Sequence, residues 1–239
     1  MTKIYIPHYT KLTKRKKEII RTCTELNKEF TIITNYDKES LINNDTLDQE
    51  NEWVKRIKEI EFILLKNAGI SSGNNINCPW LTPRKLKPAE ISLTYKHFLA
   101  LMSISIEGEP GIVFEDDVGT IEGSKENLKR AERIIKEGFD YIDLAGGCSL
   151  PIYSSDCKVD LEPNFIKTNP PRSRTTAGYI VNPSAAYKIA QNLFPAILPL
   201  DWSFQYIFVK ESMNVGWIEP PVFLHGSQSN DESSIQDDV

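Results

Sequence analysis

The sequence lacks a cysteine pattern that would indicate disulfides or a zinc site. Its four cysteines form no Cys-x-x-Cys pair and have no regular spacing; they are Cys23, Cys78, Cys148 and Cys157. A disulfide framework and a cysteine-ligated zinc site are therefore not indicated, and reduced thiols in a cytoplasmic protein are expected.

Long apolar segments and an excess of basic charge are also missing. The chain begins Met1-Thr2-Lys3-Ile4-Tyr5-Ile6 without the apolar region of a signal peptide, and no segment approaches transmembrane length. The formal net charge is -5, which argues against a nucleic-acid partner or an anionic membrane surface. We expect a soluble, cytoplasmic protein.

What the chain does contain is an alternation of strands and helices, with enough apolar residues for a sizeable core. It has 239 residues, of which 40% are hydrophobic, so one large α/β domain is possible over residues 1–229, followed by a polar acidic tail at 230–239. Strands are expected at residues 3–7, 30–34, 111–114, 139–144, 175–181 and 215–219. Helices are expected between residues 10 and 26, and over 46–67, 89–104, 124–137, 183–192 and from about 199. Residues 70–88 and 148–173 are expected to be irregular.

Three consecutive carboxylates, Glu115-Asp116-Asp117, directly follow the apolar run Gly111–Phe114. A buried strand cannot continue through three acidic groups without a large desolvation cost, so the carboxylates lie at its exit. Ligands bind at the carboxyl ends of strands in open α/β sheets, and clustered carboxylates repel one another unless a cation or a proton lies between them. The pattern predicts a divalent metal site. The competing interpretation is an acidic turn that only keeps a loop soluble.

Other candidate binding residues each have a structural interpretation as well. Arg15 could contact a phosphate-bearing ligand, although a solvated helix face is favoured. His97 shares a helix face with Glu90, and a buried histidine satisfied by a backbone carbonyl or by Glu90 is favoured. Gly146 and Gly147 follow a strand, where they allow either close approach to a ligand or a tight turn.

Two further segments carry residues with more than one interpretation. Asp201 is placed as the N-cap of a helix, and the alternative is a general base that faces the cleft. Residues 170–174 look like an exposed loop, in which Arg172 and Arg174 are either solvated or hold a diphosphate or an acidic acceptor.

The order of these motifs resembles glycosyltransferase family 25, the lipopolysaccharide and collagen-type galactosyltransferases. The resemblance is carried by the strand that ends in Glu115-Asp116-Asp117, by the preceding helix with Glu90 and His97, and by the segments that follow. These segments are Thr176–Val181 with Ser184-Ala185-Ala186, Pro199-Leu200-Asp201, and Pro220-Pro221 running into Gln228 and Ser229. The resemblance covers roughly residues 88–236, with a weaker match at the N-terminal strand and Arg15.

The resemblance implies a GT-A fold, with a mixed, mainly parallel sheet flanked by helices. It implies a UDP-sugar donor, with galactose favoured, a glycan acceptor such as a lipopolysaccharide or surface polysaccharide, and inversion at the anomeric carbon. Glu115 and Asp117 correspond to the two carboxylates of the D-x-D signature, and alternate residues leaving a strand point to the same side.

Hard oxygen ligands of this kind suit Mn²⁺ or Mg²⁺. Asp117 is the first choice for direct coordination, and Glu115 or Asp116 is assigned to the ribose or to a metal-bound water. His225 is a further candidate ligand, with a surface histidine as the alternative, and Asp201 is the candidate base.

Two other classes of function stay open at this point. One is a metal-dependent phosphohydrolase acting on a nucleotide or sugar phosphate, although the usual Asp-x-Asp nucleophile pattern is absent. The other is a non-catalytic glycan-binding relative that keeps the fold.

Overall fold

The computed structural model describes residues 2–41, 55–56, 58, 84–146, 156–159 and 162–225. Its helices in these ranges are α1 (Thr13–Leu26), α3 (Pro88–Glu107), α4 (Ser124–Ile134), α5 (Pro183–Asn192) and α6 (Leu200–Lys210), with short 3₁₀ turns η1 (Lys38–Ser40) and η3 (Ile135–Glu137). Its strands are β1 (Ile4–Pro7), β2 (Phe30–Ile33), β3 (Gly111–Phe114), β4 (Val118–Thr120), β5 (Tyr141–Asp143), β6 (Ala145–Gly146), β7 (Cys157–Val159), β8 (Glu162–Lys167), β9 (Gly178–Val181), β10 (Val215–Ile218) and β11 (Phe223–His225).

The main sheet of the described residues has the strand order β2-β1-β3-β9-β5-β10-β8-β7. Strands β2, β1 and β3 are parallel, as are β5 and β10, whereas β9 is inserted antiparallel between β3 and β5. Strand β8 is antiparallel to both β10 and β7. The predicted α/β architecture, a mixed sheet in which most strands share one direction, is confirmed.

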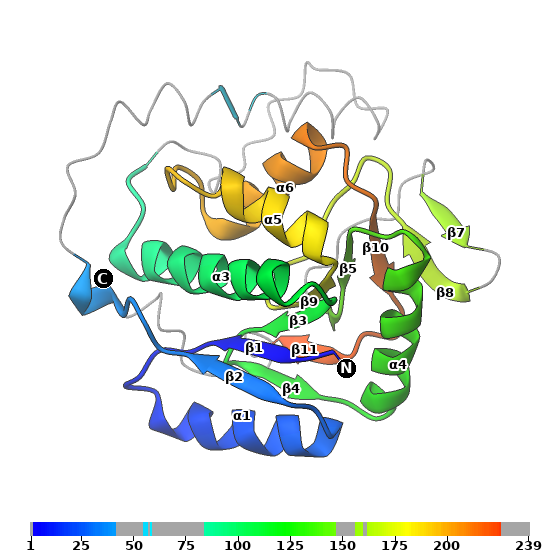
Figure 1. The fold of residues 1–239 in the computed structure, drawn as a ribbon, viewed down its shortest axis with the longest axis horizontal. Coiled ribbons are helices and arrows are strands. Elements are labelled where there is room, and N and C mark those ends of the chain that lie inside the picture. Colours follow the sequence, from blue (N-terminus) through cyan, green and yellow to red (C-terminus); the bar gives the residue numbers. More distant parts are fainter. Residues whose placement is uncertain are drawn as a thin grey trace.

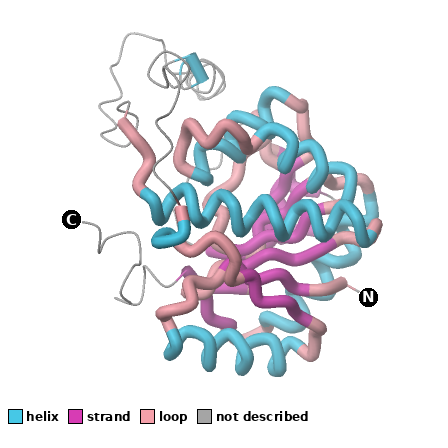
Figure 2. The backbone as a smooth tube through the Cα atoms, turned by 60° about the vertical axis from the view of Figure 1, so that its left-hand side comes forward, coloured by secondary structure: helices cyan, strands magenta, loops and turns pink. Residues whose placement is uncertain are grey.

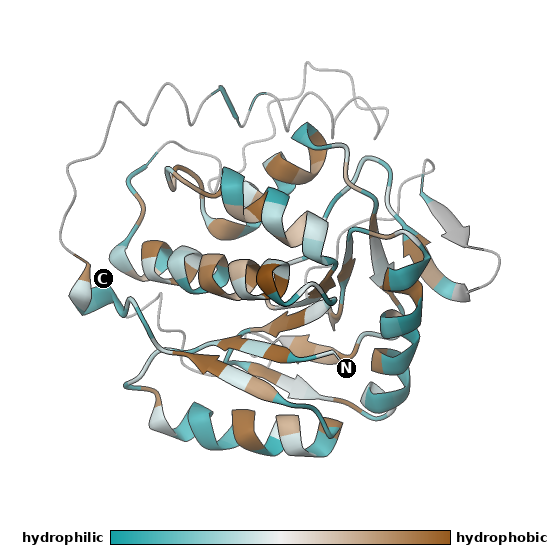
Figure 3. Cartoon of the chain, viewed as in Figure 1, coloured by the Kyte–Doolittle hydropathy of each residue, from teal (hydrophilic) through white to brown (hydrophobic). Residues whose placement is uncertain are grey.

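Helices cover both faces of this sheet (Figures 1 and 2). Alternate residues of each strand therefore point into different apolar layers, as the two-residue period of a strand requires. Ile112 and Phe114 of β3 pack in the layer with α1 and α4, whereas Val113 packs in the layer with α3, α5 and α6. In Figure 3 the strands are mostly apolar and the outer helix faces are polar.

A second, smaller sheet lies beside the exit of β3. Its order is β4-β11-β6, and β11 is antiparallel to β4 with His225 opposite Val118. The backbone of His225 therefore lies next to the residue that follows the acidic triplet. This sheet was not predicted, because strands of two or three residues carry no periodic signal.

Two other segments differ from the sequence-based prediction, and one lies outside the described residues. Strands β7 and β8 occupy part of the range 148–173 that was predicted to be irregular. Strand β9 begins at Gly178 rather than at residue 175, because the amides of Thr176 and Ala177 donate to the side chains of Asp201 and Thr175. The predicted helix over 46–67 lies almost wholly outside the described residues. No helix in the described ranges is long and apolar enough to span a membrane.

Candidate functional site

Glu115 and Asp116, the first two of the three consecutive carboxylates, direct their side chains to opposite faces of the sheet. Glu115 contacts residues of α3 and of the segment before β9, whereas Asp116 contacts α1 and the end of β1. The acidic triplet is therefore not a single cluster of equivalent groups.

Asp116 is held by donors from two elements. Its Oδ2 atom lies 2.7 Å from His8 Nδ1 and accepts the Tyr9 amide at 3.2 Å, and its Oδ1 atom accepts from Arg15 Nη1 at 2.8 Å. Burial alone would raise the pKa of Asp116, but the hydrogen bonds from His8 and Arg15 outweigh it and lower that pKa below its usual value. Asp116 is therefore ionised at neutral pH, and it joins β1, α1 and β3.

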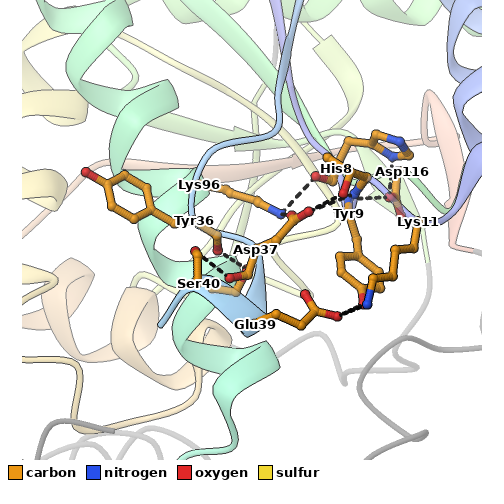
Figure 4. A network of polar contacts seen from close by, with 11 residues as sticks. His8, Tyr9, Lys11, Tyr36, Asp37, Glu39, Ser40, Lys96 and Asp116 are labelled. Atoms are coloured by element: carbon orange, nitrogen blue, oxygen red, sulfur yellow. Dashed lines mark hydrogen bonds and ion pairs between the residues drawn. The ribbon is translucent and has the colours of Figure 1, made fainter. Parts of the chain in front are cut away.

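A second polar network adjoins the first and fixes the chain beyond β2 (Figure 4). Lys96 of α3 is buried, and its Nζ atom donates to the carbonyl of His8 at 2.8 Å and to Asp37 Oδ1. Thr10 also donates to Asp37. Burial alone would raise the pKa of Asp37, but the bonds from Lys96 and Thr10 lower it. The network therefore places the buried Nζ atom of Lys96 against the backbone that follows β1.

One pocket brings these groups together at the carboxyl ends of β1 and β3. Its basic side chains come from α1, η1 and α3, and they are Arg15, Lys38 and Lys96. Glu115, Asp116 and Asp117 also line it. Basic side chains and carboxylates line the same pocket, and Arg15 is itself paired with Asp116. Such a mixed lining suits a ligand that is anionic and brings a cation with it.

Glu115 belongs to a second group of contacts that extends to α6. The Thr176 hydroxyl lies 3.0 Å from Glu115 Oε1 and 2.8 Å from Asp201 Oδ1, and the Thr176 amide donates to Asp201 Oδ1 at 2.7 Å. Thr176 is buried, whereas Asp201 is exposed. One buried hydroxyl therefore lies between the carboxylates of Glu115 and Asp201.

His97 is fully buried behind Glu115. Its Nδ1 atom is 3.0 Å from the Tyr179 hydroxyl, and its Nε2 atom is 3.5 Å from Glu115 Oε1. Burial lowers the pKa of His97 to about 3, opposed only in part by the charge of Asp201. His97 is therefore neutral, and its buried Nε2 atom makes no hydrogen bond among the described residues.

Several structural interpretations made from the sequence are wrong. The side chain of Arg15 is 16% exposed and paired with Asp116, so it does not belong to a solvated helix face. Asp201 is not an N-cap, because Pro199 takes that position and the Asp201 carboxylate accepts from Thr176 instead. His97 pairs with Tyr179 rather than with a backbone carbonyl or with Glu90, whose carboxylate accepts from Arg84 and from the Lys87 amide at the start of α3.

Gly146 and the arginines at 172 and 174 also have local explanations. A Cβ atom on Gly146 would lie 2.9 Å from Pro221 Cγ, so packing against Pro221 accounts for this glycine. The predicted exposed loop with solvated arginines is wrong, because Arg172 and Arg174 lie over the ring of Trp217 and pair with Asp156 and Glu219. Gly147 lies outside the described residues. Only the backbone of His225 is described.

Three residues of the site, His8, Lys96 and Thr176, were not predicted from the sequence. His8 follows β1 directly, so its position at the carboxyl end of a strand was available as a signal. Lys96 and Thr176 gave no such signal. Lys96 is an ordinary helix residue by pattern, and Thr176 reaches Glu115 only because β9 is inserted between β3 and β5.

The carboxylates of the pocket are the groups whose chemistry suits a divalent cation. Within the described residues, no three histidine, cysteine or acidic side chains form a group that could hold a metal ion. Asp116 is bound by His8, Tyr9 and Arg15, and Glu115 lies 3.0 Å from the Thr176 hydroxyl. Glu115 and Asp117 are the pocket carboxylates that the sequence pattern predicts for Mn²⁺ or Mg²⁺. An ion held by these two carboxylates would need further ligands, for example from a bound phosphate.

No protein-family model and no curated protein matches the sequence. Among solved structures, it resembles a glycosyltransferase involved in the glycosylation of the major capsid of PBCV-1, with 11% identity over 99% of this chain and 96% of that chain and a TM-score of 0.41. A UDP-glucose pyrophosphorylase complexed with UDP-glucose has 13% identity, coverage of 91% and 90%, and a TM-score of 0.45. Mouse xyloside xylosyltransferase 1 has 12% identity, coverage of 97% and 86%, and a TM-score of 0.40.

Identities of 11–13% and TM-scores below 0.5 do not place the chain in family 25. An assignment of activity therefore depends on the residues of the pocket.

Proposed function

We propose that this protein is an inverting, metal-dependent glycosyltransferase that moves a sugar from a UDP-sugar to a hydroxyl group of a glycan. Galactose as the sugar and a lipopolysaccharide or surface polysaccharide as the acceptor follow from the motif resemblance. One observation carries the proposal. Basic side chains from α1, η1 and α3 and the carboxylates after β3 line the same pocket at the carboxyl ends of β1 and β3.

This pocket supports binding of a nucleoside diphosphate together with a cation. Arg15, Lys38 and Lys96 supply positive charge for the phosphates. Asp117 and Glu115 would hold Mn²⁺ or Mg²⁺, and the antiparallel pairing of β11 with β4 brings the backbone of His225 next to Val118. When bound, such an ion neutralises negative charge that develops on the departing diphosphate.

In the proposed reaction, the acceptor oxygen attacks the anomeric carbon and the bond from that carbon to the diphosphate oxygen breaks. The acceptor proton passes to a carboxylate, because an alcohol is a poor nucleophile at neutral pH. Asp201 is our candidate for this base, since it is exposed and the Thr176 hydroxyl lies between its carboxylate and that of Glu115. UDP leaves as the other product.

A product assay tests the proposal. The protein is incubated with a panel of UDP-sugars, Mn²⁺ and oligosaccharide acceptors, and mass spectrometry follows both the glycan and the nucleotide. We expect free UDP and a glycan heavier by one hexose unit, with no product when the metal is chelated. Asp117→Ala should abolish transfer and keep the melting temperature, whereas Glu126→Ala, which removes an exposed carboxylate from α4, should leave transfer unchanged.

The same assay separates the competing functions. Acceptor-independent release of UMP or a sugar phosphate would indicate a phosphohydrolase. Formation of UTP from UDP-sugar and pyrophosphate would indicate a nucleotidyltransferase. Normal turnover by Asp117→Ala would contradict the proposed role of that carboxylate.

A further inference from the structure

We propose that Thr176 is a positioning residue, whose hydroxyl and amide groups hold the side chain of Asp201 in a fixed orientation beside Glu115. This inference rests on the proposed function, because it assigns to Asp201 the part of the base. Thr176 is buried in the segment that leads into β9, and its side chain does not itself line the pocket.

Two contacts of Thr176 end on one oxygen atom of Asp201. The amide donates to Oδ1 at 2.7 Å, and the hydroxyl lies 2.8 Å from the same atom. Two donors on one carboxylate oxygen restrict the rotation of the side chain and leave its other oxygen, Oδ2, as the atom available to accept a proton from a substrate. Because Asp201 is exposed, it would otherwise be free to sample several rotamers.

The hydroxyl of Thr176 has one proton and two carboxylate neighbours. It lies 3.0 Å from Glu115 Oε1 and 2.8 Å from Asp201 Oδ1, so it can donate to only one of them at a time. The contact to Asp201 is the shorter of the two, and the Thr176 amide donates to the same oxygen atom of Asp201. We therefore assign the Thr176 proton to Asp201.

Thr176 is itself held in place by the neighbouring strand β5. The buried carboxylate of Asp143 accepts from the Ser173 hydroxyl at 3.0 Å and from the Arg174 amide at 2.6 Å. The Thr175 hydroxyl accepts the Ala177 amide at 2.8 Å. Side-chain oxygens therefore fix the backbone on both sides of Thr176, which gives its hydroxyl a defined position.

The decisive variants are Thr176→Val, which keeps the shape and the amide but removes the hydroxyl, and Thr176→Ser, which restores it. We expect Thr176→Val to lower kcat by about 10- to 100-fold, because small displacements of a reacting group have effects of this size. The KM for the UDP-sugar should change by less than about twofold, since Thr176 does not line the pocket. Thr176→Ser should recover most of the lost kcat.

A matched control is Thr94→Val, which removes another buried threonine hydroxyl, one that donates to the Glu90 carbonyl within α3. It should leave kcat close to that of the wild type. Equal kcat in Thr176→Val and wild type would overturn the inference, as would an equal loss in Thr176→Val and Thr176→Ser.

Crystal structures of the wild type and both variants give a readout that does not depend on activity. Asp201 should occupy one conformation in the wild type and in Thr176→Ser, and a shifted or divided one in Thr176→Val. An unchanged Asp201 in Thr176→Val would overturn the inference even if transfer is observed. Absence of transfer by the wild type, together with the expected shift of Asp201, would instead overturn the proposed function and retain the positioning role of Thr176.

Discussion

At the scale of single residues, the adjacent carboxylates Glu115 and Asp116 have different environments. Asp116 is bound by His8, the Tyr9 amide and Arg15, and it connects β1 and α1 to β3. Glu115 faces the opposite side of the sheet, toward His97 and Thr176. The alternation of a strand explains this separation, because neighbouring residues point to opposite faces. Equal chemistry in the sequence therefore does not mean equal roles.

We predict that Asp116→Asn lowers the free energy of unfolding by about 2 kcal/mol, which is the size expected for hydrogen bonds to a charged partner. The asparagine side chain keeps the shape but carries no charge. It has one acceptor oxygen, whereas His8 and Arg15 contact different oxygen atoms of Asp116. Urea denaturation followed by circular dichroism measures the change. Asp117→Asn serves as the matched neighbour, and we expect it to retain the stability of the wild type. A loss of less than about 0.5 kcal/mol in Asp116→Asn would show that the contacts of Asp116 do not stabilise the fold.

At the scale of elements, the end of β5 contributes a buried carboxyl that controls the segment before β9. Burial raises the pKa of Asp143 from 3.8 to about 7, although the charge of Arg174 and the bonds from its amide and from Ser173 oppose this increase. The folded protein therefore keeps the Asp143 proton at pH values where the unfolded chain has lost it.

This pKa predicts a pH dependence of stability with a definite sign. The contribution of Asp143 is fully present below about pH 4 and is lost as the pH rises toward 7, at up to roughly 1.4 kcal/mol per pH unit. Asp143→Asn, which resembles the protonated acid, should lack this decline. The free energies of unfolding of the wild type and of Asp143→Asn are measured between pH 4 and pH 8, and their difference gives the contribution of Asp143.

His97 has the opposite dependence, because its pKa of about 3 makes the folded state lose stability as the pH falls below about 6.5. Both proteins contain His97, so its contribution cancels in the difference. Parallel stability curves for Asp143→Asn and the wild type would contradict the raised pKa.

The helices and strands also differ in how well they could be predicted from the sequence. Long periodic segments such as α1, α3 and α5 and the apolar strands β1 and β3 were predicted, because their patterns depend only on local spacing. The insertion of β9 between β3 and β5 was not, and this insertion brings Thr176 and Asp201 to Glu115. The carboxylates at the exit of β3 and the candidates Arg15, His97 and Asp201 could therefore be identified from the sequence, whereas the contacts of Thr176 with Glu115 and Asp201 could not.

At the scale of the whole molecule, the two apolar layers of the sheet correspond to the two halves of the site. On the side of the sheet that α1 covers, Arg15 of α1 and Asp116 after β3 form an ion pair. On the α3 and α6 side lie Glu115, His97 and Asp201. We propose that the nucleoside diphosphate binds where these halves meet, in the pocket that Lys96 also lines.

Isothermal titration calorimetry with an intact UDP-sugar, with and without Mn²⁺, tests this central claim most directly. We predict binding in the presence of Mn²⁺, a loss of at least about tenfold in affinity when the metal is chelated, and a similar loss in Asp117→Ala with metal present. Equal affinity with and without Mn²⁺, or no binding of any UDP-sugar by the wild type, would contradict the proposal that the carboxylates after β3 hold a metal-bound nucleotide sugar.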